Sequence, residues 1–162
     1  MSKSSQSRPI TPEGLERLTK ELRILENQTK ISLIKEIEYA RGHGDLSENA
    51  EYHSAKERLR LVQKRIQDLQ QSIASAQVID VRSLSGKKIM FGATVQLFCH
   101  TTQKTLKYQI VGDDESDISQ GKIAIFSALA RGLIGKQEGD KKVLITTPGG
   151  KNTYDILSVQ YI

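Results

Sequence analysis

The segment Gly42-His43-Gly44-Asp45-Leu46-Ser47-Glu48-Asn49-Ala50-Glu51-Tyr52 is the only interruption between two long amphipathic patterns. It contains three acidic residues and no lysine or arginine. Amphipathic helices joined by a short glycine-containing loop pair antiparallel. Since each pattern has roughly 30 residues and an α-helix rises about 1.5 Å per residue, the pair would form a hairpin roughly 40–45 Å long. The segment would lie at the far end of this hairpin, and we name it the tip segment.

The pattern before the tip segment predicts a helix with one irregularity. Thr11-Pro12-Glu13 has the signals of a helix start, because threonine caps, proline fits the first position and an acid suits the first turn. The pattern stops at Arg41, and Gly42 and Gly44 would end the helix. The apolar spacing alternates between three and four and then relaxes to fours, which predicts a coiled-coil seam with a local stutter. The seam residues are Leu15, Leu18, Leu22, Leu25, Thr29, Leu33, Ile37 and Ala40.

The pattern after the tip segment is more regular. Its apolar residues alternate between spacings of three and four without a fault, which is typical of one side of a coiled coil. This seam is narrow, and it accounts for an apolar fraction of only 37%. The seam residues are Tyr52, Ala55, Leu59, Val62, Ile66, Leu69, Ile73 and Ala76.

Beyond Ala76 the apolar period changes to that of strands, separated by turns rich in Gly, Asp and Pro. Between the strands, residues 127–135 predict a short helix with Ser127 as N-cap and Gly135 as its end. The fold class is therefore α+β: an N-terminal antiparallel helical hairpin over residues 11–78, then a C-terminal domain over 84–162 with a mostly antiparallel sheet. Residues 1–10 are expected to be a disordered tail. The predicted strands are 78–81, 94–98, 105–111, 122–125, 142–146 and 153–161.

Charge and cysteine content limit the partners and the compartment. The 162 residues carry a formal net charge of +5, which favours an acidic partner such as nucleic acid or a negatively charged protein surface. A solvated basic surface would give the same balance. Cys99 is the single cysteine and lies in an apolar run, so we expect a strand residue in a reducing cytoplasm rather than a nucleophile. No apolar run approaches membrane-spanning length, and we expect no membrane partner.

Asp45 and Glu48 in the tip segment permit two interpretations. They are three residues apart at a helix start, so Asp45 can be the N-cap and Glu48 can complete a capping box. The same two carboxylates offer hard oxygen ligands that suit Mg²⁺. Two are too few for a self-contained site, because Mg²⁺ would also need water, phosphate or a partner's acids. The two interpretations are compatible, since a cap can also fix the carboxylates in place.

A basic cluster follows the tip segment on the second helix. Lys56, Arg60 and Lys64 lie at i, i+4 and i+8 and form one stripe, and Arg41 closes the first helix at the same end of the hairpin. The stripe is either a solvated helix face or a surface for a phosphate backbone. Because no aromatic side chain interleaves with these cations, base stacking is not expected. The whole cluster is Lys56, Arg58, Arg60, Lys64 and Arg65.

Several motifs together resemble the bacterial transcript cleavage factors GreA and GreB, and GreA more closely. The resemblance covers essentially the whole chain after the N-terminal tail, and ordered motifs in two domains make it more specific than the tip segment alone. Its motifs are Gly44-Asp45-Leu46-Ser47-Glu48-Asn49-Ala50-Glu51-Tyr52, Ala76-Gln77-Val78-Ile79-Asp80, Phe91-Gly92-Ala93-Thr94-Val95, Ile110-Val111-Gly112-Asp113-Asp114-Glu115, Ala130-Arg131-Gly132-Leu133-Ile134-Gly135-Lys136 and Thr147-Pro148-Gly149-Gly150.

The resemblance implies a hairpin that enters the secondary channel of bacterial RNA polymerase and an FKBP-like domain that docks at the channel rim. Asp45 and Glu48 would share a Mg²⁺ ion with the polymerase's own acids, so the isolated chain would hold no cofactor and would not be an enzyme by itself. Arg41 and Lys56 match positions of the family's basic patch for backtracked RNA, and Arg60 and Lys64 are further candidate RNA-binding residues. The chain would act as a monomer in the cytoplasm.

The implied docking residues include two departures from the family pattern. The usual Ile-Ser is Ile123-Ala124 here, and the usual Ser-Pro is Ser127-Ala128. A secondary-channel regulator that binds without cleavage is the alternative function, and both acids at the tip favour cleavage over it. A chaperone or prolyl isomerase is disfavoured, because the C-terminal domain has few aromatic residues for a proline pocket. The docking residues are Asp114, Ile123, Ser127, Ala128 and Arg131.

Overall fold

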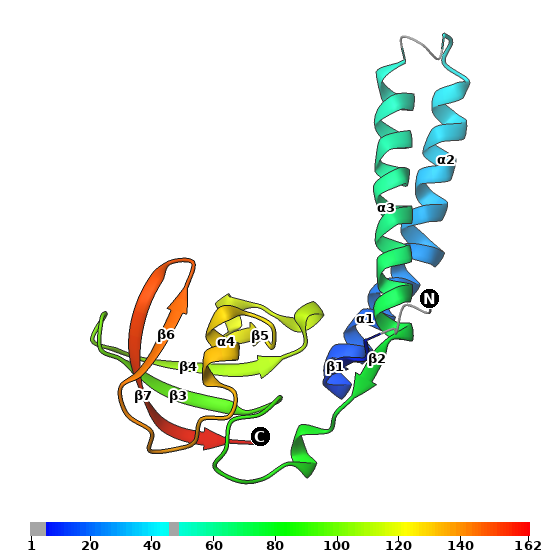
Figure 1. The fold of residues 1–162 in the computed structure, drawn as a ribbon. Coiled ribbons are helices and arrows are strands. Elements are labelled where there is room, and N and C mark those ends of the chain that lie inside the picture. The colour runs from blue at the N-terminus through cyan, green and yellow to red at the C-terminus, as the bar shows by residue number, and fades with distance from the viewer. Residues whose placement is uncertain (1–5, 46–48) are drawn as a thin grey trace, which may run out of the picture. The chain divides into compact units, whose positions relative to one another are not determined.

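The computed structural model describes residues 6–45 and 49–162, which form two compact units. One unit is Leu15–Ser75, and the other combines the chain up to Gly14 with Ala76–Ile162. The predicted α+β class is confirmed, with a helical hairpin first and a mostly antiparallel sheet after it (Figure 1). Among the described residues, no helix combines the length and the apolar character that a membrane span needs.

The first unit is the predicted hairpin. Helices α1 (Pro12–Ile24) and α2 (Lys30–Arg41) run toward the tip segment, and α3 (Ala50–Ala74) returns antiparallel beside α2 (Figure 1). The Thr11 side chain caps α1 as predicted, because its Oγ1 accepts from the Gly14 N–H at 3.1 Å. Helix α2 ends at Arg41, also as predicted.

A single π-helical turn, Leu25–Thr29, joins α1 to α2. It lies where the apolar spacing relaxes from alternating threes and fours to fours, so the predicted stutter is confirmed. The i→i+5 bonding of a π turn takes up an extra residue and rotates the following helix. The turn thereby keeps the later seam residues on the side that faces α3.

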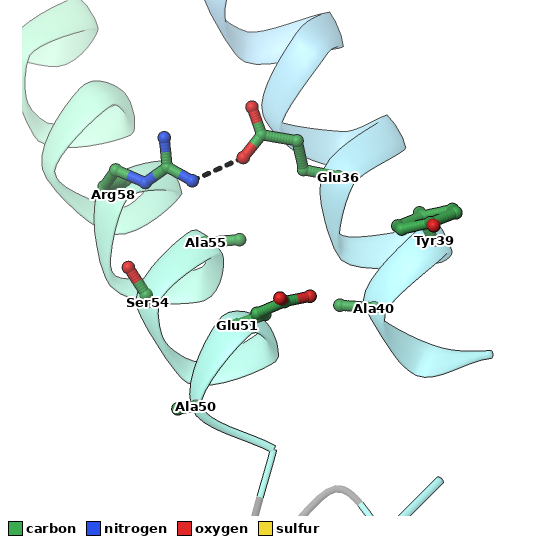
Figure 2. Close-up of a pocket in the computed structure, with 8 residues that line it drawn as sticks. All are labelled: Glu36, Tyr39, Ala40, Ala50, Glu51, Ser54, Ala55 and Arg58. Atoms are coloured by element: carbon green, nitrogen blue, oxygen red, sulfur yellow. Dashed lines mark hydrogen bonds and ion pairs between the residues drawn. The ribbon is translucent and has the colours of Figure 1, made fainter. Parts of the chain in front are cut away.

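The hairpin core is thin. Every predicted seam residue from Leu15 to Ile73 is buried or half-buried, and Leu18, Ala40, Ala55 and Leu69 are at most 2% exposed. Ala40 and Ala55 point toward one another between α2 and α3 near the tip segment (Figure 2). Such small side chains let two helices approach closely. The end of the hairpin therefore depends on close packing of α2 against α3 and buries few large side chains.

The second unit contains a five-stranded sheet in the order β5-β4-β3-β7-β6. All pairings are antiparallel except that between β4 and β5. Helix α4 (Ala128–Leu133) packs on the sheet through Ala130 and Leu133, which are fully buried. Cys99 is 2% exposed in this core, in agreement with its interpretation as a strand residue. The strands are β3 (Thr94–Cys99), β4 (Lys104–Val111), β5 (Lys122–Ala124), β6 (Val143–Thr147) and β7 (Gly150–Gln160).

Two short strands correct the predicted boundaries. Strand β1 (Arg8–Ile10) pairs in parallel with β2 (Ala76–Val78), so the last residues of the expected tail are ordered. Ala76, placed on the helical seam by its spacing, belongs to β2 instead. The predicted strand 78–81 is therefore displaced toward the N-terminus, and Val81–Ser83 forms a 3₁₀ turn. Pairing between segments almost 70 residues apart leaves no local periodicity for sequence analysis to detect.

The buried carboxylate of Glu115 organises the N-terminal part of this unit. It lies in the 3₁₀ turn Asp113–Glu115, is 3% exposed, and accepts from the backbone N–H groups of Thr11 and Gly112 at 3.0 Å each. The Thr11 hydroxyl donates to its other oxygen. A Cβ on Gly14 would lie 2.1 Å from the Glu115 side chain, so glycine is required there. A third 3₁₀ turn, Ile118–Gln120, leads into β5.

Candidate functional site at the hairpin tip

Asn49 starts helix α3, which corrects the predicted capping box. Its Oδ1 accepts from the Tyr52 N–H at 3.2 Å, and its Nδ2 donates to the Ala40 carbonyl at 2.6 Å. Asp45 is therefore not the N-cap. An aspartate offers acceptors alone, whereas asparagine also carries a donor for a carbonyl at the end of α2. Glu48, the other half of the predicted box, lies outside the described residues.

Asp45 is exposed beyond the end of α2. It follows Gly44, whose φ of +118° is a backbone conformation that favours glycine. Together with Tyr39, His43, Asn49, Ala50 and Glu51, it lines an open hollow of about 610 Å³. The structure thus presents the Asp45 carboxylate at the surface, where it could reach a metal ion that another molecule also binds.

The ring of Tyr52 brings together two of the predicted RNA-binding residues. Tyr52 is 8% exposed, which confirms its interpretation as a packing residue of the seam. The Arg41 guanidinium carbon lies 5.9 Å from its ring centroid and the Lys56 Nζ lies 5.8 Å from it. Cations at this distance interact favourably with the ring. One aromatic side chain therefore gathers a cation from each helix.

The other two predicted RNA-binding residues, Arg60 and Lys64, differ in whether an acidic side chain already binds them. Arg60 donates to Glu57 through Nη2 at 2.7 Å and Nε at 3.0 Å. This hydrogen bonding raises the pKa of Arg60 and lowers the pKa of Glu57. Lys64 is exposed and has no ion pair within the part of the chain that the structure describes. Of the stripe, Lys56 and Lys64 are thus more available to a phosphate than Arg60.

The remaining cations of the basic cluster bridge the two helices. Arg58 forms an ion pair with Glu36, and the Arg65 Nε lies 2.8 Å from the Glu21 Oε1. Both pairs are exposed, so each contributes little to stability, on the order of 0–1 kcal/mol. Each of these two arginines therefore already has an acidic partner on the first part of the hairpin.

Figure 2 shows a second hollow, of about 380 Å³, on one flank of the hairpin near the tip segment. The Glu36–Arg58 pair closes one end, and Glu51 lies at the other with its carboxylate directed toward α2. Sequence analysis missed this site because its residues come from two helices and share no motif. The available signal in the sequence was Tyr39, an aromatic residue outside the seam positions and close to the tip segment. The lining residues are Glu36, Tyr39, Ala40, Ala50, Glu51, Ser54, Ala55 and Arg58.

The predicted polymerase-docking residues occupy the second unit. Ile123 is 5% exposed in the sheet core, so it could affect docking only by positioning its neighbours. Ser127 caps α4, with its Oγ accepting from the Ala130 N–H at 3.2 Å. Arg131 is exposed, Ala128 is half-buried, and Asp114 lies 3.8 Å from the Arg8 guanidinium.

Comparison with known proteins identifies the class of protein that has this fold and this tip. The model described as "Transcription elongation factor, N-terminal" matches residues 8–78, and the model "Transcription elongation factor, GreA/GreB, C-term" matches residues 84–161. Together they cover almost the whole chain. The chain belongs to the GreA/GreB family of transcription elongation factors.

Curated relatives are similar over nearly their full length. Transcription elongation factor GreA of Bartonella tribocorum is 52% identical over 154 residues, which is 95% of this chain and 98% of that protein. Its counterpart in Brucella canis is 47% identical over the same shares. Among solved structures, GreA factor homolog 1 of Thermus thermophilus matches with 23% identity and a TM-score of 0.43, covering 94% of this chain and 97% of that one.

Proposed function

We propose that this chain is a transcription elongation factor that enters the secondary channel of bacterial RNA polymerase and stimulates cleavage of backtracked RNA. The observation that carries the proposal is the tip of the hairpin. Asp45 is exposed just beyond the end of α2, and Arg41 and Lys56 both lie close to the Tyr52 ring. The names of the GreA relatives support a role in transcription elongation. The chain would act in the cytoplasm as a monomer.

The tip carboxylates would contribute ligands rather than a complete catalytic centre. Asp45 and Glu48 would hold a Mg²⁺ ion jointly with acids of the polymerase, and the ion would supply Lewis-acid activation of water for phosphodiester hydrolysis. The exposed Asp45 carboxylate has the hard oxygen chemistry that this ion prefers. The chain is therefore not proposed to be an enzyme by itself.

The cations next to the tip would hold the RNA. Arg41 and Lys56 lie close to one ring, so they form a compact positive site for phosphate oxygens at the 3′ end. Lys64 would extend this site along α3. The exposed Arg131 and the half-buried Asp114 and Ala128 would meanwhile contact the rim of the channel.

A cleavage assay on a backtracked elongation complex with 3′-labelled RNA tests the proposal. Adding the chain should release short 3′ fragments, and Asp45→Asn or Glu48→Gln should abolish this release while polymerase binding and helicity persist. Glu38→Gln is the matched control, since it removes one exposed charge from α2 outside the hollows. Full cleavage by both tip variants would disprove the metal role. Binding without cleavage by the unsubstituted chain would instead indicate a non-cleaving regulator.

A further inference from the structure

The two flanks of the hairpin near its tip differ in chemistry. Helical periodicity places Lys56 on one side of the α3 seam and Glu51 and Arg58 on the other. The first is the basic flank proposed to hold RNA. The second carries the 380 Å³ hollow of Figure 2, which the proposed function leaves without a role.

The hollow on the second flank is acidic. Glu36 and Glu51 contribute two negative charges and Arg58 one positive charge, so its lining carries one net negative charge. The Arg58 charge is already matched by Glu36. Glu51 has no hydrogen bond or ion pair within the described residues, so its carboxylate is available to a ligand. Because a carboxylate only accepts hydrogen bonds, the ligand must donate them.

Tyr39 adds an aromatic wall to the same hollow. Its side chain is 70% exposed, the most exposed aromatic among the described residues. The His43 ring contacts it edge-on, with centroids 4.5 Å apart and planes at 76°. An exposed ring and a carboxylate that line the same hollow suit a flat cationic group, which can stack on the ring and donate to the acid.

We propose that this hollow binds an arginine or lysine side chain of the polymerase. The guanidinium or ammonium group would lie against Tyr39 and donate to Glu51, with the Glu36–Arg58 pair as the end wall. A phosphate is disfavoured by the net negative charge. The hairpin would then be held on opposite flanks, by RNA at Arg41 and Lys56 and by protein at Tyr39. Two such contacts would fix its rotation about its own axis and so aim Asp45. This inference rests on the proposed function, since it requires the hairpin to enter the polymerase.

Photocrosslinking identifies directly which molecule occupies the hollow. Benzoylphenylalanine is placed at position 39 of the full chain, bound to a backtracked elongation complex and irradiated. The expected product is a crosslink to a polymerase peptide that contains arginine or lysine. The same group at Leu61, which is 51% exposed on α3 outside the hollow, should not label that peptide. A crosslink to RNA, or none to either partner, would overturn the proposal.

Affinity measurements give an independent test. Tyr39→Ala and Glu51→Gln should each raise the Kd for polymerase by about threefold to tenfold, the range expected for a partly exposed cation–π contact or ion pair. Tyr39→Phe keeps the ring and Glu38→Gln keeps the hollow, so both should bind like the unsubstituted chain. Glu51→Gln should also weaken the salt dependence of binding. Unchanged affinity in both test variants refutes the proposal.

The outcomes separate this inference from the proposed function. If the unsubstituted chain binds polymerase but does not stimulate cleavage, the cleavage role fails while the crosslink and affinity results still stand. If cleavage occurs but the hollow variants bind normally, only the inference fails. If the chain does not bind polymerase at all, both are wrong.

Discussion

The Asn49 side chain donates a hydrogen bond to the Ala40 carbonyl at 2.6 Å and so joins the end of α2 to the start of α3. The same side chain accepts from the Tyr52 N–H. One residue therefore gives a second donor to a carbonyl that also accepts from the His43 N–H, and an acceptor to an N–H in the first turn of α3. It also fixes the start of the helix that carries Tyr52 and Lys56.

Asn49→Ala should lower the free energy of unfolding of the hairpin by about 1–2 kcal/mol, because a helix cap and an interhelical hydrogen bond are lost together. Asn49→Asp keeps the acceptor and loses the donor, so it should show the smaller loss. Urea unfolding followed by circular dichroism measures both. Equal stability of the unsubstituted chain and the alanine variant would show that the two Asn49 hydrogen bonds do not stabilise the hairpin.

The cations of the stripe should differ in their effect on RNA. Lys56→Gln should reduce photocrosslinking to the RNA 3′ end by about threefold, in proportion to the loss of one phosphate contact. Arg60→Gln should reduce it less, since Arg60 already donates twice to Glu57. Equal losses from both substitutions would show that the Glu57 pair opens when RNA binds.

Glu115→Ala should destabilise the second unit by about 2–4 kcal/mol, because the N–H groups of Thr11 and Gly112 would lose a buried acceptor. Amide hydrogen exchange should rise at these two positions. Asp113→Ala is the matched control, an exposed acid in the same turn that should change stability little. Slow exchange at Thr11 in the Glu115 variant would mean that other contacts hold this segment.

Asp155 should contribute to the acid sensitivity of the second unit. The Lys142 N–H donates to its Oδ1 at 2.8 Å and lowers its pKa below the usual 3.8, and the His100 imidazole adds to the effect. A lowered folded-state pKa gives stability that is present above the unfolded pKa and is lost as pH falls through the folded value. The urea midpoint of the unsubstituted chain should therefore fall more steeply below about pH 4 than that of Asp155→Asn. Parallel pH profiles would exclude this contribution.

Much of the hairpin was predictable from local pattern. The seam from Leu15 to Ile73, the stutter at Leu25–Thr29 and the end of α2 at Arg41 were confirmed, because helical periodicity is a property of neighbouring residues. The strands of the sheet were found within about two or three residues for the same reason. The pairing of β1 with β2 was missed, since it depends on segments far apart in the chain.

The candidate site was predicted in part. Sequence spacing indicated Asp45, Arg41 and Lys56 as neighbours of the tip, but not that Tyr52 gathers the two cations. The spacing also predicted that Arg60 and Lys56 both bind RNA, although Glu57 partly neutralises the charge of Arg60. Nor did it indicate that Tyr39 on α2 lines a hollow together with Glu51 of α3.

The sequence by itself determined that this chain forms a helical hairpin with an acidic tip and a separate antiparallel sheet, because periods of 3.5 and 2 residues are local properties. Tertiary structure alone decided that Asn49 rather than Asp45 caps α3, that Glu115 holds the Thr11 segment, and that Tyr39 and Glu51 share a hollow. The Glu115 contacts and the shared hollow depend on groups from distant parts of the chain, and Asn49 is distinguished from Asp45 by its bond to Ala40 on the other helix. No local pattern encodes such an approach.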